Sequence, residues 1–285
     1  MSGSGTANEV LISAAELQTA LAKDPSVRLL DVRWELGRTD GHRQYLEGHL
    51  PGAVFVDLDA ELSAPPGTGG RHPLPAPEDL SAAARRWGIN DGDLVVAYDA
   101  AGSSAAARAW WLLRHAGFPN VRLLDGGLRA WQEAGGELAA GEETPAPGNA
   151  DLAWGHMPVA DMDSAGKLAA EGVLLDARAP ERFRGETEPI DPRAGHIPGA
   201  VNVPAAGNLD ERGRFADPAV LRSRFEAAGV DGIRETAAYC GSGVFAAAEV
   251  AALQIAGFDA ALYPGSWSEW SSTPGRPVAT GAADG

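Results

Sequence analysis

The single cysteine of this chain, Cys240, lies in a loop whose residues are suited to thiol chemistry. It follows an apolar run that ends at Tyr239, and it precedes Gly241-Ser242-Gly243-Val244-Phe245 and an alanine-rich stretch. If the run is a strand and the stretch a helix, unpaired amides and the helix dipole at the helix N-terminus favour the thiolate. The glycines let the loop curl so that several N–H groups converge on one sulfur. We therefore predict a cradle for a thiolate or persulfide, and the alternative is a buried structural cysteine.

The segments that must position this loop occur twice in the chain. The two copies share these segments in the same order: residues 29–33 with 174–178, residues 48–54 with 195–201, and Tyr98-Asp99 with Tyr239-Cys240. In the first copy Asp99 therefore takes the place of the cysteine, and a carboxylate cannot carry transferable sulfur. We predict that the first copy is catalytically inactive and supplies the other wall of a cleft, since binding sites favour domain interfaces.

Within each copy, predicted strands alternate with predicted helices. Ser13 and Glu16 form a capping-box pattern that begins a helix. For the rest of the first copy we predict strands at 27–31, 53–56, 94–98 and 121–124, and helices at 80–87 and 104–116. The alternation indicates an α/β protein of two tandem domains, each a mostly parallel sheet flanked by helices. We place the domains at 9–140 and 151–278, with a linker at 141–150 that is rich in Pro, Gly and Glu.

Length, charge and cysteine content limit the classes of function. A chain of 285 residues fits two domains at roughly 150 residues per domain. The formal net charge of −16 argues against nucleic acid or an anionic membrane surface as a partner, because both require a positive field. Residues 1–8 lack the apolar core of a signal peptide, and no apolar run is long enough to span a bilayer. One cysteine excludes an internal disulfide or a thiolate metal cluster, and we expect a cytoplasmic protein whose thiol stays reduced.

These features together resemble the tandem rhodanese family, over the span from about Val10 to Trp270. The family comprises thiosulfate sulfurtransferases and 3-mercaptopyruvate sulfurtransferases, which carry sulfur as a persulfide on the loop cysteine. The resemblance implies that Cys240 carries the sulfur without a metal or an organic cofactor, and that cyanide, glutathione or thioredoxin accepts it. Cys-Gly-Ser-Gly-Val is typical of the mercaptopyruvate enzymes, whereas thiosulfate enzymes typically have Cys-Arg-Lys-Gly-Val. The resemblance thus implies 3-mercaptopyruvate as the donor, with thiosulfate as the alternative.

By the same resemblance, Ser242 belongs to a proton relay with a histidine and an aspartate of the first domain. The matching positions are His72 and Asp59, although Asp57 or Glu61 could replace the aspartate because the spacing differs from the family pattern by two residues. The alternative for His72 is an exposed loop histidine. In the family, this relay assists cleavage of the carbon–sulfur bond.

Two arginines are the candidates for binding the substrate carboxylate. Arg182, in Arg-Phe-Arg-Gly, matches a substrate arginine of the family, and a guanidinium fork suits a carboxylate. Arg193 is the candidate for the second arginine, while Arg184 reads as a solvated surface residue. The amides from Gly241 through Gly243 and Val244 to Phe245 are expected to bind the persulfide, and Phe245 stands where the family usually has threonine.

Other motifs are better explained by structure or exclude other functions. His49 and His196 are matching residues of the two copies, so we expect them to be structural, and we expect the same of the matching pair Asp31 and Asp176.

Phosphatases and arsenate reductases with this kind of domain have a longer loop that ends in an arginine, and no arginine lies between Cys240 and Glu249. A non-catalytic binding or regulatory module remains the alternative from a different class. The sequence gives no indication of the oligomeric state.

Overall fold

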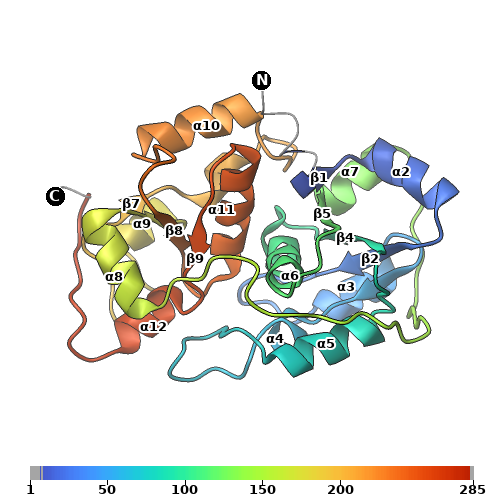
Figure 1. Cartoon of the computed structure of the whole chain (residues 1–285), viewed down its shortest axis with the longest axis horizontal. Helices are drawn as coiled ribbons and strands as arrows, with labels where there is room; N and C mark the ends of the chain where they lie inside the picture. The colour runs from blue at the N-terminus through green and yellow to red at the C-terminus, as the bar shows by residue number, and fades with distance from the viewer. Residues whose placement is uncertain (1–6, 8, 283–285) are drawn as a thin grey trace.

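The computed structural model describes residue 7 and residues 9–282. The prediction that residues 1–8 are not a signal peptide thus lies outside the described residues, apart from Ala7. Two β-sheets, one from each half of the chain, form the framework of the molecule (Figure 1). All pairings between their strands are parallel, as the alternation of strands and helices predicts. The predicted fold class is confirmed.

The sheet of the first half has the strand order β1-β5-β4-β2-β3. Its strands are β1 (Leu11–Ile12), β2 (Val27–Asp31), β3 (Ala53–Phe55), β4 (Leu94–Tyr98) and β5 (Val121–Leu124). The four predicted strands are confirmed, and β3 ends one residue earlier than predicted. The sequence did not predict β1, because a two-residue strand shows no alternation; its pairing with β5 fixes it at the sheet edge.

The sheet of the second half has the order β7-β6-β8-β9. Its strands are β6 (Val173–Asp176), β7 (Val201–Asn202), β8 (Thr236–Tyr239) and β9 (Ala261–Leu262). Val159 forms a parallel bridge with Leu262 beyond β9, where β1 pairs with β5 in the first sheet. The two sheets therefore repeat one topology.

Helices flank both sheets. The first half contains α2 (Ala14–Lys23), α3 (Gly41–Glu47), α4 (Leu58–Glu61), α5 (Pro77–Arg86), α6 (Ser104–His115) and α7 (Gly127–Glu133). The second half contains α8 (Met162–Glu171), α9 (Pro180–Phe183), the 3-10 helix η1 (Ala205–Asn208), α10 (Pro218–Ala227), α11 (Val244–Ile255) and α12 (Ser266–Ser272). The predicted capping box is present at α2, where Ser13 and Glu16 bond to each other's backbone N–H groups. Helix α5 begins three residues before the predicted start, because Pro77 suits the first turn of a helix.

The two halves meet along α6 and α11, which face each other between the sheets (Figure 1). Both helices are rich in buried alanines, so their backbones approach closely, and one continuous hydrophobic core includes residues of both. The predicted linker at 141–150 contains no helix or strand and follows the first half: Gly148 and Ala150 donate to the carbonyl groups of Arg85 and Ile89. Cys240 and Asp99 each precede one of these two helices, so both loops lie next to the junction.

The histidines and aspartates that occur in both copies are buried parts of the framework. The Nδ1–H groups of His49 and His196 donate to the carbonyl oxygens of Tyr45 and Phe183, at 2.9 and 2.8 Å, and the two imidazoles stack on the rings of the same residues. Asp31 and Asp176 form buried ion pairs with Arg33 and Arg178, each at 2.6 Å. Among the described residues, no helix combines the length and apolar character needed to cross a membrane.

Candidate active site

The loop between β8 and α11 places Cys240 at the N-terminus of a helix, as predicted. Gly243 is the N-cap of α11 with φ +81°, and its N–H donates to Cys240 Sγ at 3.2 Å. A β-carbon at Gly243 would lie 2.6 Å from the Pro264 carbonyl oxygen, so both the backbone conformation and the space require glycine. The sulfur accepts this one amide hydrogen bond, whereas the sequence predicted that several amides would converge on it.

The start of α12 holds the other side of the loop. Ser266 has φ +54°, and its Oγ accepts the N–H of Cys240 at 3.1 Å. The N–H groups of Trp267 and Ser268 donate to the carbonyl oxygens of Cys240 and Gly241, at 3.0 and 2.9 Å. Sequence reasoning missed Ser266. The available signal was the alignment of the copies, because the first copy has glycine at the matching position, Gly127, with φ +56°.

Cys240 lies in a cavity of about 300 Å³ that both halves of the chain line. The residue as a whole is 1% exposed, so the cavity is its route to a substrate. The first half contributes Trp34, Leu36 and Arg71 to the wall. The second half contributes small residues and prolines and, in addition, Arg178, Arg182, Cys240, Gly241, Ser242 and Phe245. Phe245 is 38% exposed and gives the cavity an apolar edge. The Val244 side chain is buried in the core, and neither it nor Gly243 lines the cavity.

The structure brings Ser242, His72 and Asp59 together in one hydrogen-bonded chain. His72 Nδ1 lies 2.7 Å from Ser242 Oγ, and His72 Nε2 lies 3.0 Å from Asp59 Oδ1. The two alternatives for the aspartate are engaged elsewhere. Asp57 caps α4 by accepting the N–H groups of Asp59 and Ala60, and Glu61 accepts from Asp57, Arg86 and Trp87. Asp59 is therefore the carboxylate that contacts His72.

The environment of His72 favours its neutral form. Burial lowers the pKa of His72, and Arg108 and Arg71 act in the same direction, while Asp59 opposes them. Because the Asp59 side chain is 63% exposed, solvent weakens its effect. If Nε2–H donates to Asp59, the unprotonated Nδ1 accepts the hydroxyl hydrogen of Ser242. The chain can thus pass a proton from Ser242 to the imidazole.

Arg108 of α6 joins the histidine loop to the cysteine loop, and sequence reasoning missed it. Its guanidinium is fully buried and donates to the carbonyl oxygens of Leu62, His72, Pro73 and Gly243. Burial lowers the pKa of Arg108 to about 10, with the Cys240 thiolate acting in the opposite direction, so the arginine stays charged at neutral pH. A buried cation therefore lies beside the cysteine loop.

Of the two arginines predicted to bind substrate, one lines the cavity and the other does not. Arg182 of α9 lies at the cavity wall, with its side chain 14% exposed. Arg193 instead donates to four carbonyl oxygens at 2.6 to 3.2 Å; they belong to Trp270, Ser271, Thr273 and Arg276. These carbonyl groups lie at and just beyond the C-terminus of α12, where a cation is favourable. The guanidinium is thereby engaged away from Cys240.

Comparison with known proteins identifies the fold. The Rhodanese-like domain family matches residues 13–134 and 160–273, one match in each half of the chain. This chain belongs to the rhodanese family. The two rhodanese domains explain both the internal repeat and the shared topology of the two sheets.

The relatives of this rhodanese are sulfurtransferases. A Mycobacterium tuberculosis protein named "Putative thiosulfate sulfurtransferase SseB" is 51% identical over 96% of this chain and 98% of its own length. The human 3-mercaptopyruvate sulfurtransferase is 36% identical over 91% of both chains. The crystal structure of the 3-mercaptopyruvate sulfurtransferase SseA from Escherichia coli superposes with a TM-score of 0.79 at 34% identity, covering 91% of this chain and 99% of that one. The chain is thus a sulfurtransferase with two tandem rhodanese domains.

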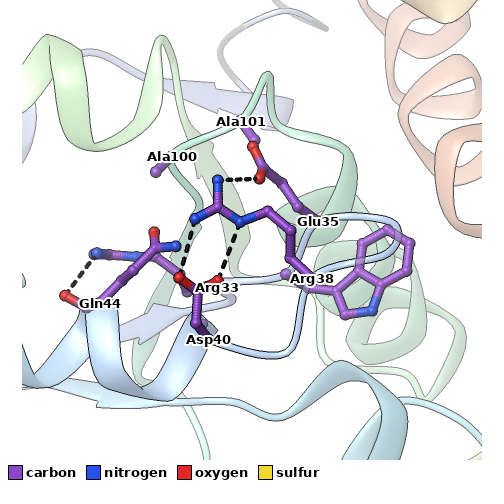
Figure 2. A pocket seen from close by; sticks show the side chains of 9 residues that line it. Arg33, Glu35, Arg38, Asp40, Gln44, Ala100 and Ala101 are labelled. Atoms are coloured by element: carbon purple, nitrogen blue, oxygen red, sulfur yellow. Dashed lines mark hydrogen bonds and ion pairs between the residues drawn. The ribbon is translucent and has the colours of Figure 1, made fainter.

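The first rhodanese domain closes the position at which the second has its cavity. The Asp99 carboxylate accepts the N–H groups of Ala101, Ser103, Ala105 and Ala106, at 2.8 to 3.1 Å. Burial raises the pKa of Asp99, and the four amides act in the opposite direction. Beside this loop a cavity of about 20 Å³ is lined by Arg38, which pairs with Glu35 and Asp40 (Figure 2). The inactivity of the first copy stays a prediction.

Proposed function

We propose that this protein transfers sulfur from 3-mercaptopyruvate to a thiol or cyanide, through a persulfide on Cys240. The Ser242–His72–Asp59 chain at the cavity is the observation that carries the choice of donor. Cleavage of thiosulfate releases sulfite, a stable anion that needs no proton. Cleavage of the carbon–sulfur bond of mercaptopyruvate leaves the electron pair on carbon, as an enolate that must be protonated. A proton relay therefore serves the second donor and not the first.

The reaction begins when the Cys240 thiolate attacks the sulfur of the donor. A sulfur–sulfur bond forms and the carbon–sulfur bond breaks, so the bonding pair leaves with carbon as the enolate of pyruvate. The relay through Ser242 and His72 moves the proton of the donor thiol to this enolate. Pyruvate leaves, and Cys240 retains the sulfur as a persulfide. An acceptor thiol or cyanide then attacks the outer sulfur and restores the thiolate.

Backbone amides of the cysteine loop are placed to stabilise the persulfide. The Gly243 N–H already donates to Cys240 Sγ, and further amides of the loop up to Phe245 are our candidates for contacts with the outer sulfur. The steps use only groups of the chain and its substrates, so we propose no metal and no organic cofactor. Glutathione and thioredoxin are the proposed thiol acceptors. We place the activity in the cytoplasm, where a lone thiol stays reduced.

The test compares the two donors on the purified protein. We expect kcat/KM with 3-mercaptopyruvate to exceed that with thiosulfate by about 100-fold, the lower end of what one general acid–base group contributes. Treatment with the donor should add the mass of one sulfur to Cys240, and the C240S variant should take up none. Thiosulfate is the second candidate, because the relative at 51% identity carries that name. If thiosulfate is the better donor, our assignment of the donor is wrong, and absence of transfer from either donor would support a binding module.

A further inference from the structure

We propose that Arg71 of the first domain and Arg182 of the second form a clamp that binds the carboxylate of the sulfur donor beside Cys240. This inference rests on the proposed function, because it names the residues that recognise that donor. It assigns to Arg71 the role that the sequence gave to Arg193. Four features of the structure support it: the anchoring of Arg71, the arrangement of the two guanidinium groups, the space above Gly241, and the charge of the site.

Arg71 lies in the loop between α4 and α5, which reaches across to α12 of the second domain (Figure 1). Its N–H donates to Ser268 Oγ at 3.1 Å. Its neighbour Gly70 has φ +98°, and a β-carbon there would lie 2.7 Å from the Gly265 carbonyl oxygen. The loop is therefore fixed against the segment that also holds Cys240, and Arg71 has a defined position in the cavity wall.

The guanidinium groups of Arg71 and Arg182 are held in place by one buried carboxylate. Asp191, whose side chain is 3% exposed, accepts from Arg71 Nη1 through Oδ1 and from Arg182 Nη2 through Oδ2, the latter at 3.2 Å. Arg182 Nη2 also donates to Glu188 at 2.7 Å. Within the part of the chain that the structure describes, Arg71 Nη2 and Arg182 Nη1 have no acceptor, and both Nε–H groups are buried without one. Each arginine thus retains donors for a ligand.

These free nitrogens lie over the backbone next to the reactive sulfur. A β-carbon at Gly241 would lie 3.0 Å from Arg71 Nη2 and 3.4 Å from Arg182 Nη1. Gly241 does not have a positive φ, so its backbone does not require glycine. A side chain at this position would contact both guanidinium groups and make them shift, so glycine lets the two arginines approach the cysteine loop. Because Arg71, Arg182 and Cys240 line the same cavity, an anion there can accept from both arginines and still place its sulfur near the thiolate.

The charge of the clamp suits a monoanion. Asp191 and Glu188 balance the two guanidinium charges, so the site offers directed donors without a large positive charge. A carboxylate bound by two forks gains charge-assisted hydrogen bonds. A dianion such as thiosulfate gains less from this arrangement than it would from uncompensated cations.

The test measures donor and product binding in R71Q. We expect KM for 3-mercaptopyruvate and the Kd of pyruvate, which has the same carboxylate and does not react, to rise about 10- to 100-fold, the effect of losing one charge-assisted contact. R71Q leaves Asp191 paired with Arg182, so the fold is retained, and R71K should give an intermediate loss. The matched control is R184Q, because Arg184 is exposed, pairs with Glu186 and does not line the cavity. Its constants should equal those of the wild type.

Two outcomes separate this inference from the proposed function. If the wild type does not turn over 3-mercaptopyruvate, the proposed function is wrong, and pyruvate binding still tests the clamp. If R71Q binds pyruvate and 3-mercaptopyruvate within twofold of the wild type, the clamp is wrong even though the donor stands. Discharge of a preformed persulfide by cyanide, which has no carboxylate, should proceed at the wild-type rate in R71Q. A slower discharge would mean that Arg71 acts on the loop itself, which would also overturn the clamp.

Discussion

The two rhodanese domains have the same strand–loop–helix turn, with the carboxylate of Asp99 in the first and the sulfur of Cys240 in the second. In the first domain, four residues separate Asp99 from α6, and the carboxylate accepts four backbone N–H groups. In the second domain, three residues separate Cys240 from α11, and the sulfur accepts one. The first loop is therefore filled by its own side chain, whereas the second leaves space for a sulfur atom that arrives with a substrate.

The surroundings of the two loops differ in the same sense. The cavity that the Cys240 loop lines is about 300 Å³, whereas the cavity that residues 100 and 101 of the Asp99 loop line is about 20 Å³. A neighbouring cavity of about 460 Å³ in the first domain has no residue of the Asp99 loop in its lining. Across the junction, the first domain supplies His72, Arg71 and Arg108 to the second loop. The comparison shows that duplication allowed one copy to become part of the other copy's active site. Four predictions test this difference between the two domains.

The largest effect is expected from exchanging the N-cap residue of the second loop for that of the first. Ser103 occupies the N-cap of α6 with φ +64°, whereas Gly243 occupies that of α11 with φ +81°. G243S should lower sulfur transfer at least about 100-fold, because a β-carbon would lie 2.6 Å from the Pro264 carbonyl oxygen and displace the cysteine loop. The control S103G relieves a left-handed serine and should be neutral or stabilising by about 1 kcal/mol. Near-normal transfer by G243S would show that the loop tolerates the geometry of the first copy.

The second prediction concerns His72, which contacts Ser242 of the second loop. The relay needs neutral His72, and burial lowers the pKa of His72 below its ordinary value of 6.5. The neutral form is present above this lowered pKa, so kcat/KM for the donor should stay constant down to that pH and then fall tenfold per unit. H72N should reduce kcat/KM by about 100-fold and remove the acid limb. Cyanide discharge of the persulfide is the control step, and an acid limb that persists in H72N would assign it to another group.

The third prediction tests whether Asp99 stabilises the first loop. D99A leaves four N–H groups, three of them buried, without their acceptor and should lower the free energy of unfolding by about 3 kcal/mol. C240A loses one amide hydrogen bond to sulfur and should cost about 1 kcal/mol. Urea unfolding of both variants gives the comparison, and D99N should be intermediate because it keeps one acceptor oxygen. Equal losses for D99A and C240A would contradict the difference that we draw between the loops.

The smallest effect is expected at the pair Ser266 and Gly127. S266G removes the acceptor of the Cys240 N–H but makes the left-handed backbone easier, as glycine does at position 127. Its free energy of unfolding should stay within about 1 kcal/mol of the wild type, and sulfur transfer should fall only several-fold. S266A loses the same acceptor and keeps the left-handed strain, so it should be about 1 kcal/mol less stable than S266G. The reverse order would show that left-handed backbone strain does not determine stability at this position.

The sequence alone determined the features that local patterns encode. The internal repeat fixed two domains of one topology, and strand and helix patterns placed Cys240 and Asp99 in matching turns. Gly243 followed from the need for a loop that curls around the sulfur, and the structure shows this residue in a left-handed conformation at φ +81°. Ser242, His72 and Asp59 came from the family resemblance, and the structure places them within hydrogen-bond distance. These residues were accessible because a motif identifies each of them.

Tertiary structure alone decided which cations surround the sulfur. Arg71 precedes His72 in a loop without periodicity, and its partner Asp191 lies 120 residues away. Arg193 lies near the expected place in the sequence, yet carbonyl groups at and just beyond the C-terminus of α12 bind its guanidinium. Arg108 lies on a predicted helix, but only the packing of α6 on α11 brings it to Gly243. A sequence pattern reports the conformation and burial of its own segment, whereas the partner of a long charged side chain depends on how two domains dock.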